Sequence, residues 1–142
     1  MLIWDEKFAT GHKVIDDDHR RLFDLVNHLY LALKHGFAAR ETNAVVDDLF
    51  EYAETHFARE EQLMDRVRCS VTGANCAAHK ILREKIAAWK LRLESDGPSE
   101  MLLMDIHHHL SLWLIHHIQQ LDCTLREHPT DEATPSAGPL PA

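Results

Sequence analysis

Four segments of this chain have the residue spacing of amphipathic helices, and each carries metal-ligand side chains on the stripe that should face the core. Six such residues lie on or beside these stripes: His19 on the first, His56 and Glu60 on the second, His79 on the third, and His117 and Asp122 on the fourth. Burying a charged carboxylate or an unpaired imidazole is costly unless a partner compensates it. One such residue is compatible with an ordinary hydrogen-bonded core histidine, but six on four stripes indicate one shared partner. A metal site is the simplest partner that satisfies them all.

The composition favours a single all-α domain. A chain of 142 residues can bury a core, 45% of its residues are hydrophobic, and Gly and Pro are scarce before the C-terminal segment. The net charge of −8, with no basic stripe, argues against a nucleic-acid partner. Twelve histidines in so short a chain again favour a metal.

The sequence also indicates where the protein resides. No apolar stretch approaches the roughly 18 residues that cross a bilayer, and the N-terminus lacks the basic and apolar regions of a signal peptide. Three cysteines, Cys69, Cys76 and Cys123, form no Cys-x-x-Cys pair and are typical of reduced thiols. We therefore expect a cytoplasmic protein with no membrane partner.

Turn and capping residues divide the chain into an N-terminal arm and four helices. The arm covers residues 1–17, with Asp16 or Asp17 as the expected cap of the first helix, which ends at Gly36. Further helices are predicted over about 40–67, from a Thr72 cap to about residue 95, and over about 99–127. Short connections between helices of similar length predict an antiparallel up-down-up-down four-helix bundle. Residues 1–128 form this domain, and 129–142 are predicted to be a disordered tail.

The spacing of the polar residues constrains the metal site. His56 and Glu60 stand four apart and share one helix face. His117 and Asp122 stand five apart, about 140° around an ideal helix, so they cannot both point straight at one ion. They can flank a two-metal centre, or the helix can adjust locally. Histidine and carboxylate ligands together suit iron, zinc, copper or manganese.

Five motifs resemble the hemerythrin family, and the motif of the arm resembles its bacterial branch, the bacteriohemerythrins. They are Trp4-x-x-x-Phe8-x-Thr10-Gly11, Ile15-Asp16-x-Asp18-His19, His56-Phe57-x-x-Glu60-Glu61, His79-x-x-Leu82 and Trp113-Leu114-x-x-His117-Ile118-x-x-x-Asp122. The resemblance covers about residues 1–127 in order and spacing.

The resemblance implies a non-haem diiron centre with a bridging oxo or hydroxo group and O2 as its ligand. It implies that His19 and His56 hold one iron and that His79 and His117 hold the other. Glu60 and Asp122 would bridge the two ions. In the family, O2 binds reversibly at an open position on the iron that has two histidines.

One position departs from the family pattern. The third helix of hemerythrins carries His-x-x-x-His, and the residue four before His79 is Asn75. Three interpretations stay open: water takes the vacant position, Asn75 ligates through its amide oxygen, or Cys76 binds as a thiolate. A fourth is that Asn75 only hydrogen bonds within the first turn of its helix.

Other polar residues are expected to be peripheral. The run His107-His108-His109 spans about 200° of a helix and cannot converge on one site. Four histidines are expected at the surface: His12, His28, His35 and His128. Asp18 is a candidate for a supporting role beside His19.

The first functional hypothesis is O2 binding for sensing, delivery or storage. The second is a diiron redox enzyme that reduces O2, peroxide or NO, so whether the protein is an enzyme stays open. The third is a metal-stabilised interaction module that holds zinc. The small ligands expected are O2 or other diatomic or anionic molecules, and the sequence identifies no protein partner.

Overall fold

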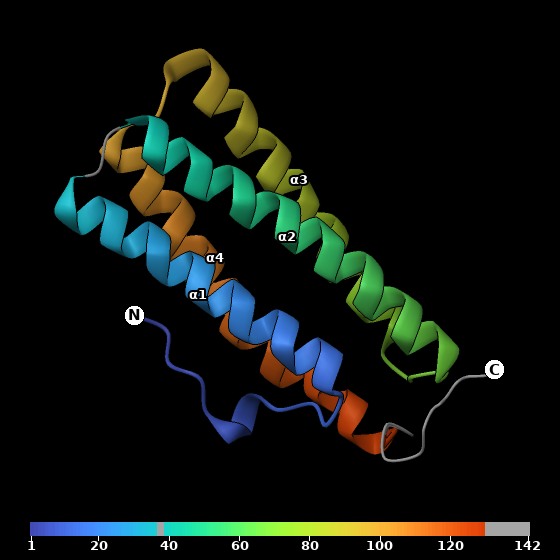
Figure 1. The fold of residues 1–142 in the computed structure, drawn as a ribbon. Helices are drawn as coiled ribbons and strands as arrows, with labels where there is room; N and C mark the ends of the chain where they lie inside the picture. The colour runs from blue at the N-terminus through green and yellow to red at the C-terminus, as the bar shows by residue number, and fades with distance from the viewer. Residues whose placement is uncertain (37–38, 130–142) are drawn as a thin grey trace.

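The computed structural model describes residues 1–36 and 39–129, and four long helices dominate it (Figure 1). The elements, in chain order, are η1 (Glu6–Phe8), α1 (Lys13–His35), α2 (Ala39–Arg66), α3 (Thr72–Asp96), α4 (Glu100–Gln120) and η2 (Asp122–Glu127). No strand occurs among these described residues. Nearly all of the predicted tail, from residue 130 onward, lies outside them.

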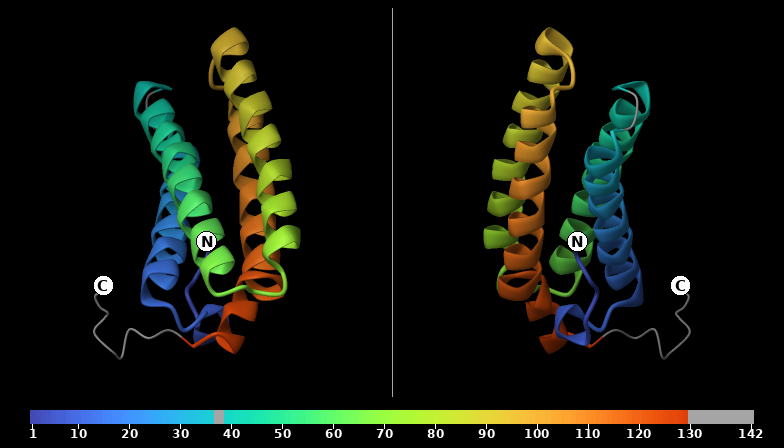
Figure 2. Two further views of the ribbon diagram at one scale, coloured as in Figure 1. Left: turned by 90° about the vertical axis from the view of Figure 1, so that its right-hand side faces the viewer. Right: turned by 90° about the vertical axis from the view of Figure 1, so that its left-hand side faces the viewer.

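The helices form the antiparallel four-helix bundle that the sequence predicts. Helix α1 packs against α2 and α4, and α3 packs against the same two neighbours. Figure 2 shows the long axes running side by side, with successive helices in opposite directions. The core consists of apolar side chains from all four helices, among them Leu29, Val46, Leu82 and Ile106, each at most 2% exposed. The apolar stripes therefore fix the bundle.

The start of α1 differs from the prediction. The helix begins at Lys13, so neither Asp16 nor Asp17 caps it. The Asp16 carboxylate instead accepts hydrogen bonds from the backbone N–H and the hydroxyl of Thr10, at 2.7 and 2.8 Å. Gly11, at φ +85°, makes the turn that brings the arm back over the helix. Asp16 thus ties the arm to α1.

The predicted Thr72 cap of α3 is also wrong. The residue in the capping position is Val71, and no side chain caps this helix start. The Thr72 hydroxyl donates instead to the carbonyls of Cys69 and Met64, at 2.7 and 3.2 Å. Thr72 therefore stabilises the α2–α3 connection.

The predicted fourth helix divides into two elements. Helix α4 ends at Gln120, and residues 122–127 continue as the 3₁₀ helix η2. The arm packs against η2 at this end of the bundle (Figure 1). Arg126 donates hydrogen bonds to the arm carbonyls of Ala9 and Lys7, at 2.6 and 2.7 Å. Within the described part of the chain, none of the helices combines the length and apolar character needed to cross a bilayer.

Candidate metal centre

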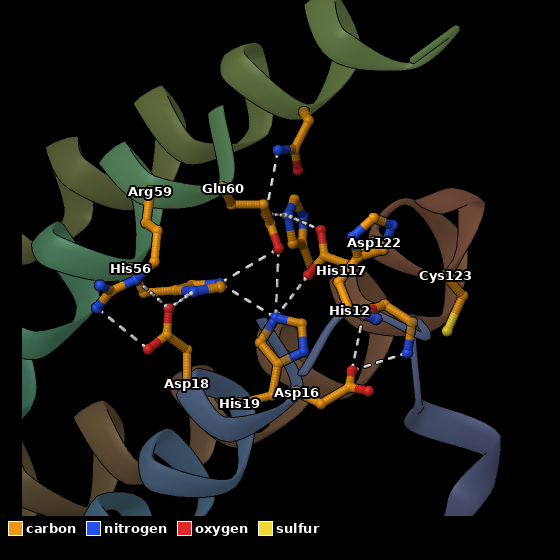
Figure 3. Close-up of polar contacts among 12 residues, drawn as sticks. His12, Asp16, Asp18, His19, His56, Arg59, Glu60, His117, Asp122 and Cys123 are labelled. Carbon is orange, nitrogen blue, oxygen red and sulfur yellow. Dashed lines mark hydrogen bonds and ion pairs between the residues drawn. The ribbon is translucent and has the colours of Figure 1, made fainter. Parts of the chain in front are cut away.

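The six residues singled out from the apolar stripes meet at one end of the bundle. Figure 3 labels all of them except His79. They come from the first turns of α1, the C-terminal half of α2, the second turn of α3, the last turn of α4 and the first residue of η2. All are buried: His19, Glu60, His79 and Asp122 are fully enclosed, and His56 and His117 are 2% and 6% exposed. The structure therefore brings together every residue that the stripes predicted.

The first half of the site is formed by two imidazoles and two carboxylates. The Nε2 atoms of His19 and His56 lie 3.1 Å apart. Oε2 of Glu60 lies 3.3 Å from each of them. Oδ2 of Asp122 lies 3.1 Å from Nε2 of His19. Four potential ligand atoms thus surround one point.

The second half has the same composition. The Nε2 atoms of His79 and His117 lie 3.1 Å apart. Oε1 of Glu60 lies 3.2 Å from Nε2 of His79 and 3.9 Å from Nε2 of His117. Oδ1 of Asp122 lies 3.1 Å from Nε2 of His117. Each carboxylate therefore offers one oxygen to each half.

The contacts between these atoms fit metal coordination better than a hydrogen-bond network. Both oxygens of Asp122 and Oε2 of Glu60 are buried without an aligned hydrogen bond, although imidazole nitrogens lie nearby. Two nitrogen ligands placed about 2.1 Å from one ion at right angles lie about 3.0 Å apart, close to both observed nitrogen pairs. Within each half, all ligand atoms lie within 4.8 Å of one another. The residues present therefore fit a two-metal centre.

The end of α4 explains how residues five apart converge. The N–H of Leu121 donates to the carbonyl of His117 at 2.9 Å and closes the helix. The backbone of Leu121 departs from regular helix geometry, with φ at −117° and ψ at −56°. The tighter η2 then begins at Asp122. On a continued α-helix Asp122 would lie about 140° from His117. The structure shows the predicted local adjustment of the helix, and Asp122 contacts both halves, so the two predicted alternatives are compatible.

A carboxylate supports one imidazole in each half of the centre. In the first half, Nδ1 of His56 lies 3.1 Å from Oδ2 of Asp18. Asp18 also accepts hydrogen bonds from Tyr52 at 2.7 Å and from Arg59 at 2.8 Å. Figure 3 shows the contact with Arg59. Burial raises the pKa of Asp18, but the hydrogen bonds from His56, Tyr52 and Arg59 prevail and lower it to about 2. Asp18 therefore contacts His56 across the helix pair and not His19, beside which the supporting role was expected.

The second half uses Glu61 in the same way. Oε2 of Glu61 lies 2.7 Å from Nδ1 of His79 and accepts a hydrogen bond from Arg83 at 3.1 Å. Carboxylates in this position fix the orientation of a ligating imidazole and raise its basicity. The sequence reasoning missed Tyr52, Arg59 and Arg83, because their partners lie on other helices and no spacing within one helix points to them.

Two aromatic rings cover the second half. Phe57 stacks on His79 with ring centroids 4.2 Å apart, and Trp113 stacks on His117 at the same separation. Phe57 is 1% exposed. Stacking of these rings favours one orientation of each imidazole.

Charge on the histidines compensates the two carboxylates when no metal is bound. Burial lowers the pKa of His19, but hydrogen bonds to Asp122 and Glu60 outweigh this effect and raise it to about 9. The pKa of His117 rises to about 9 for the same reasons. Burial raises the pKa of Glu60, yet the surrounding histidines hold it well below its usual value. Protons and metal ions therefore compete for the same nitrogens.

Asn75 and Cys76 lie in different environments, and only Asn75 contacts one of the six residues of the site. Asn75 is fully buried, and its amide Nδ2 donates to Oε1 of Glu60 at 3.1 Å. This bond crosses from α3 to α2, and Oδ1 of Asn75 has no hydrogen-bond partner, so the interpretation that Asn75 only bonds within the first turn of its helix is wrong. The Cys76 sulfur belongs to neither group of ligand atoms, and Cys76 is partly exposed. Burial, helped by Glu61, raises the pKa of the Cys76 thiol, which disfavours the thiolate.

Among the remaining histidines, His12 differs from the expectation. It is 4% exposed, and its Nε2 lies 2.7 Å from the carbonyl oxygen of His128. His12 therefore joins the arm to the end of η2. The His107–His109 run lies outside both groups of ligand atoms, as its geometry predicted.

Comparison with known proteins agrees with this geometry. The sequence profile of the hemerythrin HHE cation binding domain matches residues 10–125. The chain belongs to this family. A bacteriohemerythrin of Stenotrophomonas maltophilia is 29% identical over 119 residues, 84% of this chain and 75% of that protein. A bacteriohemerythrin of Clostridium acetobutylicum is 26% identical over 125 residues, 86% of this chain and 96% of that protein.

The comparison with solved structures shows the same fold. A crystal structure of wild-type hemerythrin superposes with a TM-score of 0.81 at 24% identity, and the match covers 91% of this chain and 98% of that one. This hemerythrin-family chain therefore shares the four-helix-bundle fold of that hemerythrin.

Proposed function

We propose that this hemerythrin-family protein holds two iron ions and binds O2 reversibly. The observation that carries the proposal is the pair of ligand groups that share Glu60 and Asp122. A shared carboxylate with one oxygen directed to each half is the arrangement that holds two metal ions side by side. The names of the bacteriohemerythrin relatives support iron and O2 over other metals and ligands.

In this proposal each residue has a defined role. His19 and His56 hold one ion, and His79 and His117 hold the other. Glu60 and Asp122 hold both. The carboxylates Asp18 and Glu61 orient one imidazole in each half, at 3.1 and 2.7 Å. The six buried ligands need no large movement to bind the ions, so the site is preorganised.

When bound by these six residues, a pair of ferrous ions would supply the two electrons that reversible O2 binding requires. The chain supplies an enclosed and largely apolar environment that shields the site from bulk solvent. Phe57 and Trp113 lie against the imidazoles of the second half, and Ile15, which is fully buried, belongs to the small apolar cluster at this end of the bundle. Excluding water favours release of O2 over irreversible oxidation.

The test is a cycle of aeration and deaeration. Ferrous iron is added anaerobically to the metal-free full chain, and the absorption spectrum is followed on exposure to air and then under vacuum. A ligand-to-iron band that appears with air and disappears under vacuum supports the proposal. Zinc-loaded protein is the matched control, because it has the same fold without redox chemistry. Iron-loaded protein that never develops such a band contradicts the proposal.

A second function, reduction of O2, peroxide or NO, is favoured by one observation. Asn75 stands where the third imidazole of the His79–His117 half would be, and fewer nitrogen ligands leave that ion more accessible. Steady consumption of O2 by the iron-loaded protein with an added electron donor supports the enzyme. Stoichiometric and reversible uptake supports the binding protein. Stoichiometric zinc in protein isolated without added metal supports a metal-stabilised interaction module.

A further inference from the structure

The environment of Asn75 defines what completes the second half of the centre. Asn75 is 0% exposed and lies on α3, one helical turn before His79. Its Nδ2 donates a hydrogen bond to Oε1 of Glu60 at 3.1 Å. Oε1 is the Glu60 oxygen that faces the second half, 3.2 Å from Nε2 of His79. The Asn75 amide therefore lies directly against the proposed metal position.

The direction of this hydrogen bond argues against Asn75 as a metal ligand. The amide nitrogen is a donor and has no lone pair available for an ion. If the amide turned over, its oxygen would face the negatively charged Oε1 and the bond to Glu60 would be lost. The Asn75 side chain is also one bond shorter than the path from Cα to Nε2 in a histidine. Asn75 thus holds the bridging carboxylate and leaves the metal position open.

The amide oxygen of Asn75 gives a separate reason to expect a further ligand at the metal position. Oδ1 is buried and has no hydrogen-bond partner. A buried acceptor without a partner is unfavourable, so it requires a donor in the complete site. In the second half, the Nε2 atoms of His79 and His117 are directed at the metal position and cannot serve as this donor once an ion is bound. A ligand of the ion that carries its own proton can serve.

The donor sets of the two halves lead to the same conclusion. Each half offers two imidazole nitrogens and two carboxylate oxygens, so the two halves are equivalent in type and number of protein ligands. Two imidazoles and carboxylate are the ligands with which non-haem iron sites retain open positions. An open position is therefore expected on both ions.

From these observations, and on the basis of the proposed diiron function, we propose that the His79–His117 half keeps a labile position for a small exchangeable ligand. Water or hydroxide occupies it at rest and donates a hydrogen bond to Oδ1 of Asn75, and small anions displace it. Asn75 is then a positioning residue that binds this ligand and Glu60 simultaneously.

The test uses Co²⁺ and azide as probes on the full chain. Metal-free protein is titrated with Co²⁺, whose absorption spectrum reports coordination number and thiolate ligation, and the loaded protein is then titrated with azide. The variants are Asn75→His and Asn75→Ala, with Cys76→Ser as the matched control on the same helix. Thermal unfolding and circular dichroism show whether each variant is folded.

The parent should bind two Co²⁺ ions and two azide ions. Asn75→His should tighten one Co²⁺ equivalent by about tenfold or more and lose one azide equivalent, because the added imidazole fills the position. Asn75→Ala should retain both Co²⁺ ions and bind azide at least about threefold more tightly, because water loses its acceptor while azide needs none. Cys76→Ser should match the parent.

Three results would overturn the inference. Loss of one Co²⁺ equivalent in Asn75→Ala makes Asn75 a ligand. Unchanged azide stoichiometry in folded Asn75→His means that no position is open, and unchanged or weaker azide binding in Asn75→Ala contradicts the hydrogen bond to Oδ1. A protein that takes up two metals but never shows a reversible O2 band contradicts the proposed function, whereas a reversible band with unaltered azide binding in both variants contradicts only this inference.

Discussion

Metal-free protein should become less stable as the pH rises, because buried histidines of the site lose their protons. In metal-free protein the pKa of His19 is raised from 6.5 to about 9, because hydrogen bonds to Asp122 and Glu60 outweigh the effect of burial. A group with a raised folded-state pKa stabilises the fold fully below its unfolded pKa and loses this contribution as the pH rises through the folded value. The window is therefore about pH 6.5 to 9.

The magnitude follows from the same values. One pKa unit corresponds to about 1.4 kcal/mol, so the rise in the pKa of His19 is worth on the order of 3 kcal/mol. His117 has a similarly raised pKa but shares Asp122 and Glu60 with His19, so the two contributions do not add. Metal-free protein should thus lose about 3 kcal/mol of unfolding free energy between pH 6.5 and 9, which is a large part of typical domain stability.

The stabilisation that bound metal provides should increase across this pH window. The ligating nitrogens must lose their protons, so metal binds more tightly as the pH rises. The difference in thermal midpoint between metal-loaded and metal-free protein should therefore grow from pH 6.5 to 9.

The assay is urea and thermal unfolding of metal-free and Zn²⁺-loaded protein at pH 6.5, 8 and 9. The variant His19→Gln should have a smaller pH dependence than the parent in metal-free form. His28→Gln, at an exposed position of α1, should keep the parental dependence. A metal-free stability that is constant or rises over this window, or equal midpoints with and without metal, would refute the reasoning.

Four further substitutions test the proposed centre and the residues that support it, each measured by Co²⁺ titration. Glu60→Ala should lower the number of bound metals, whereas Glu61→Ala should retain two ions with about 10- to 100-fold weaker binding; identical results would show that Glu60 is not a shared ligand. Asp18→Asn should weaken binding by about the same factor without changing stoichiometry, and an unaltered affinity would show that His56 is held without it. Arg126→Ala should lower the thermal midpoint and weaken metal binding severalfold, because it releases η2 and with it Asp122; a lower midpoint with parental affinity would limit Arg126 to stability.

The helix faces could be predicted from the sequence because they depend only on the helical period. A period of 3.6 residues puts His56 and Glu60 on one face whatever the helix packs against. The same period assigns His19, His79 and His117 to faces that must be buried. Since four buried faces meet in one core, the convergence of these residues followed from the spacing.

The helix starts could not be predicted in the same way. Asp16 and Thr72 are both good capping residues, and local sequence alone favours that role. In the structure Asp16 bonds to Thr10 in the arm, and Thr72 bonds to carbonyls at the end of α2. When the local sequence allows a side chain two alternative hydrogen-bond partners, tertiary contacts select one of them. The sequence pattern does not contain those contacts.

The support of the imidazoles illustrates the same limit. Asp18 precedes His19 in sequence, which suggested that it acts there. Adjacent residues on a helix point about 100° apart, so Asp18 turns away from His19 and towards α2, where it meets His56. The correct partner is the residue that faces Asp18 across the helix pair.

Asp122 shows how a break in regular structure brings one carboxylate to both halves of the site. On a regular continuation of α4, Asp122 would lie about 140° around the helix axis from His117. Because α4 ends at Gln120 and η2 begins at Asp122, this side chain lies at the end of the bundle with an oxygen 3.1 Å from His19 and the other 3.1 Å from His117. Glu60 reaches both halves from the side, so the two bridging carboxylates approach from different directions. The arm, bonded to η2 through Arg126, therefore helps to hold the element that positions Asp122.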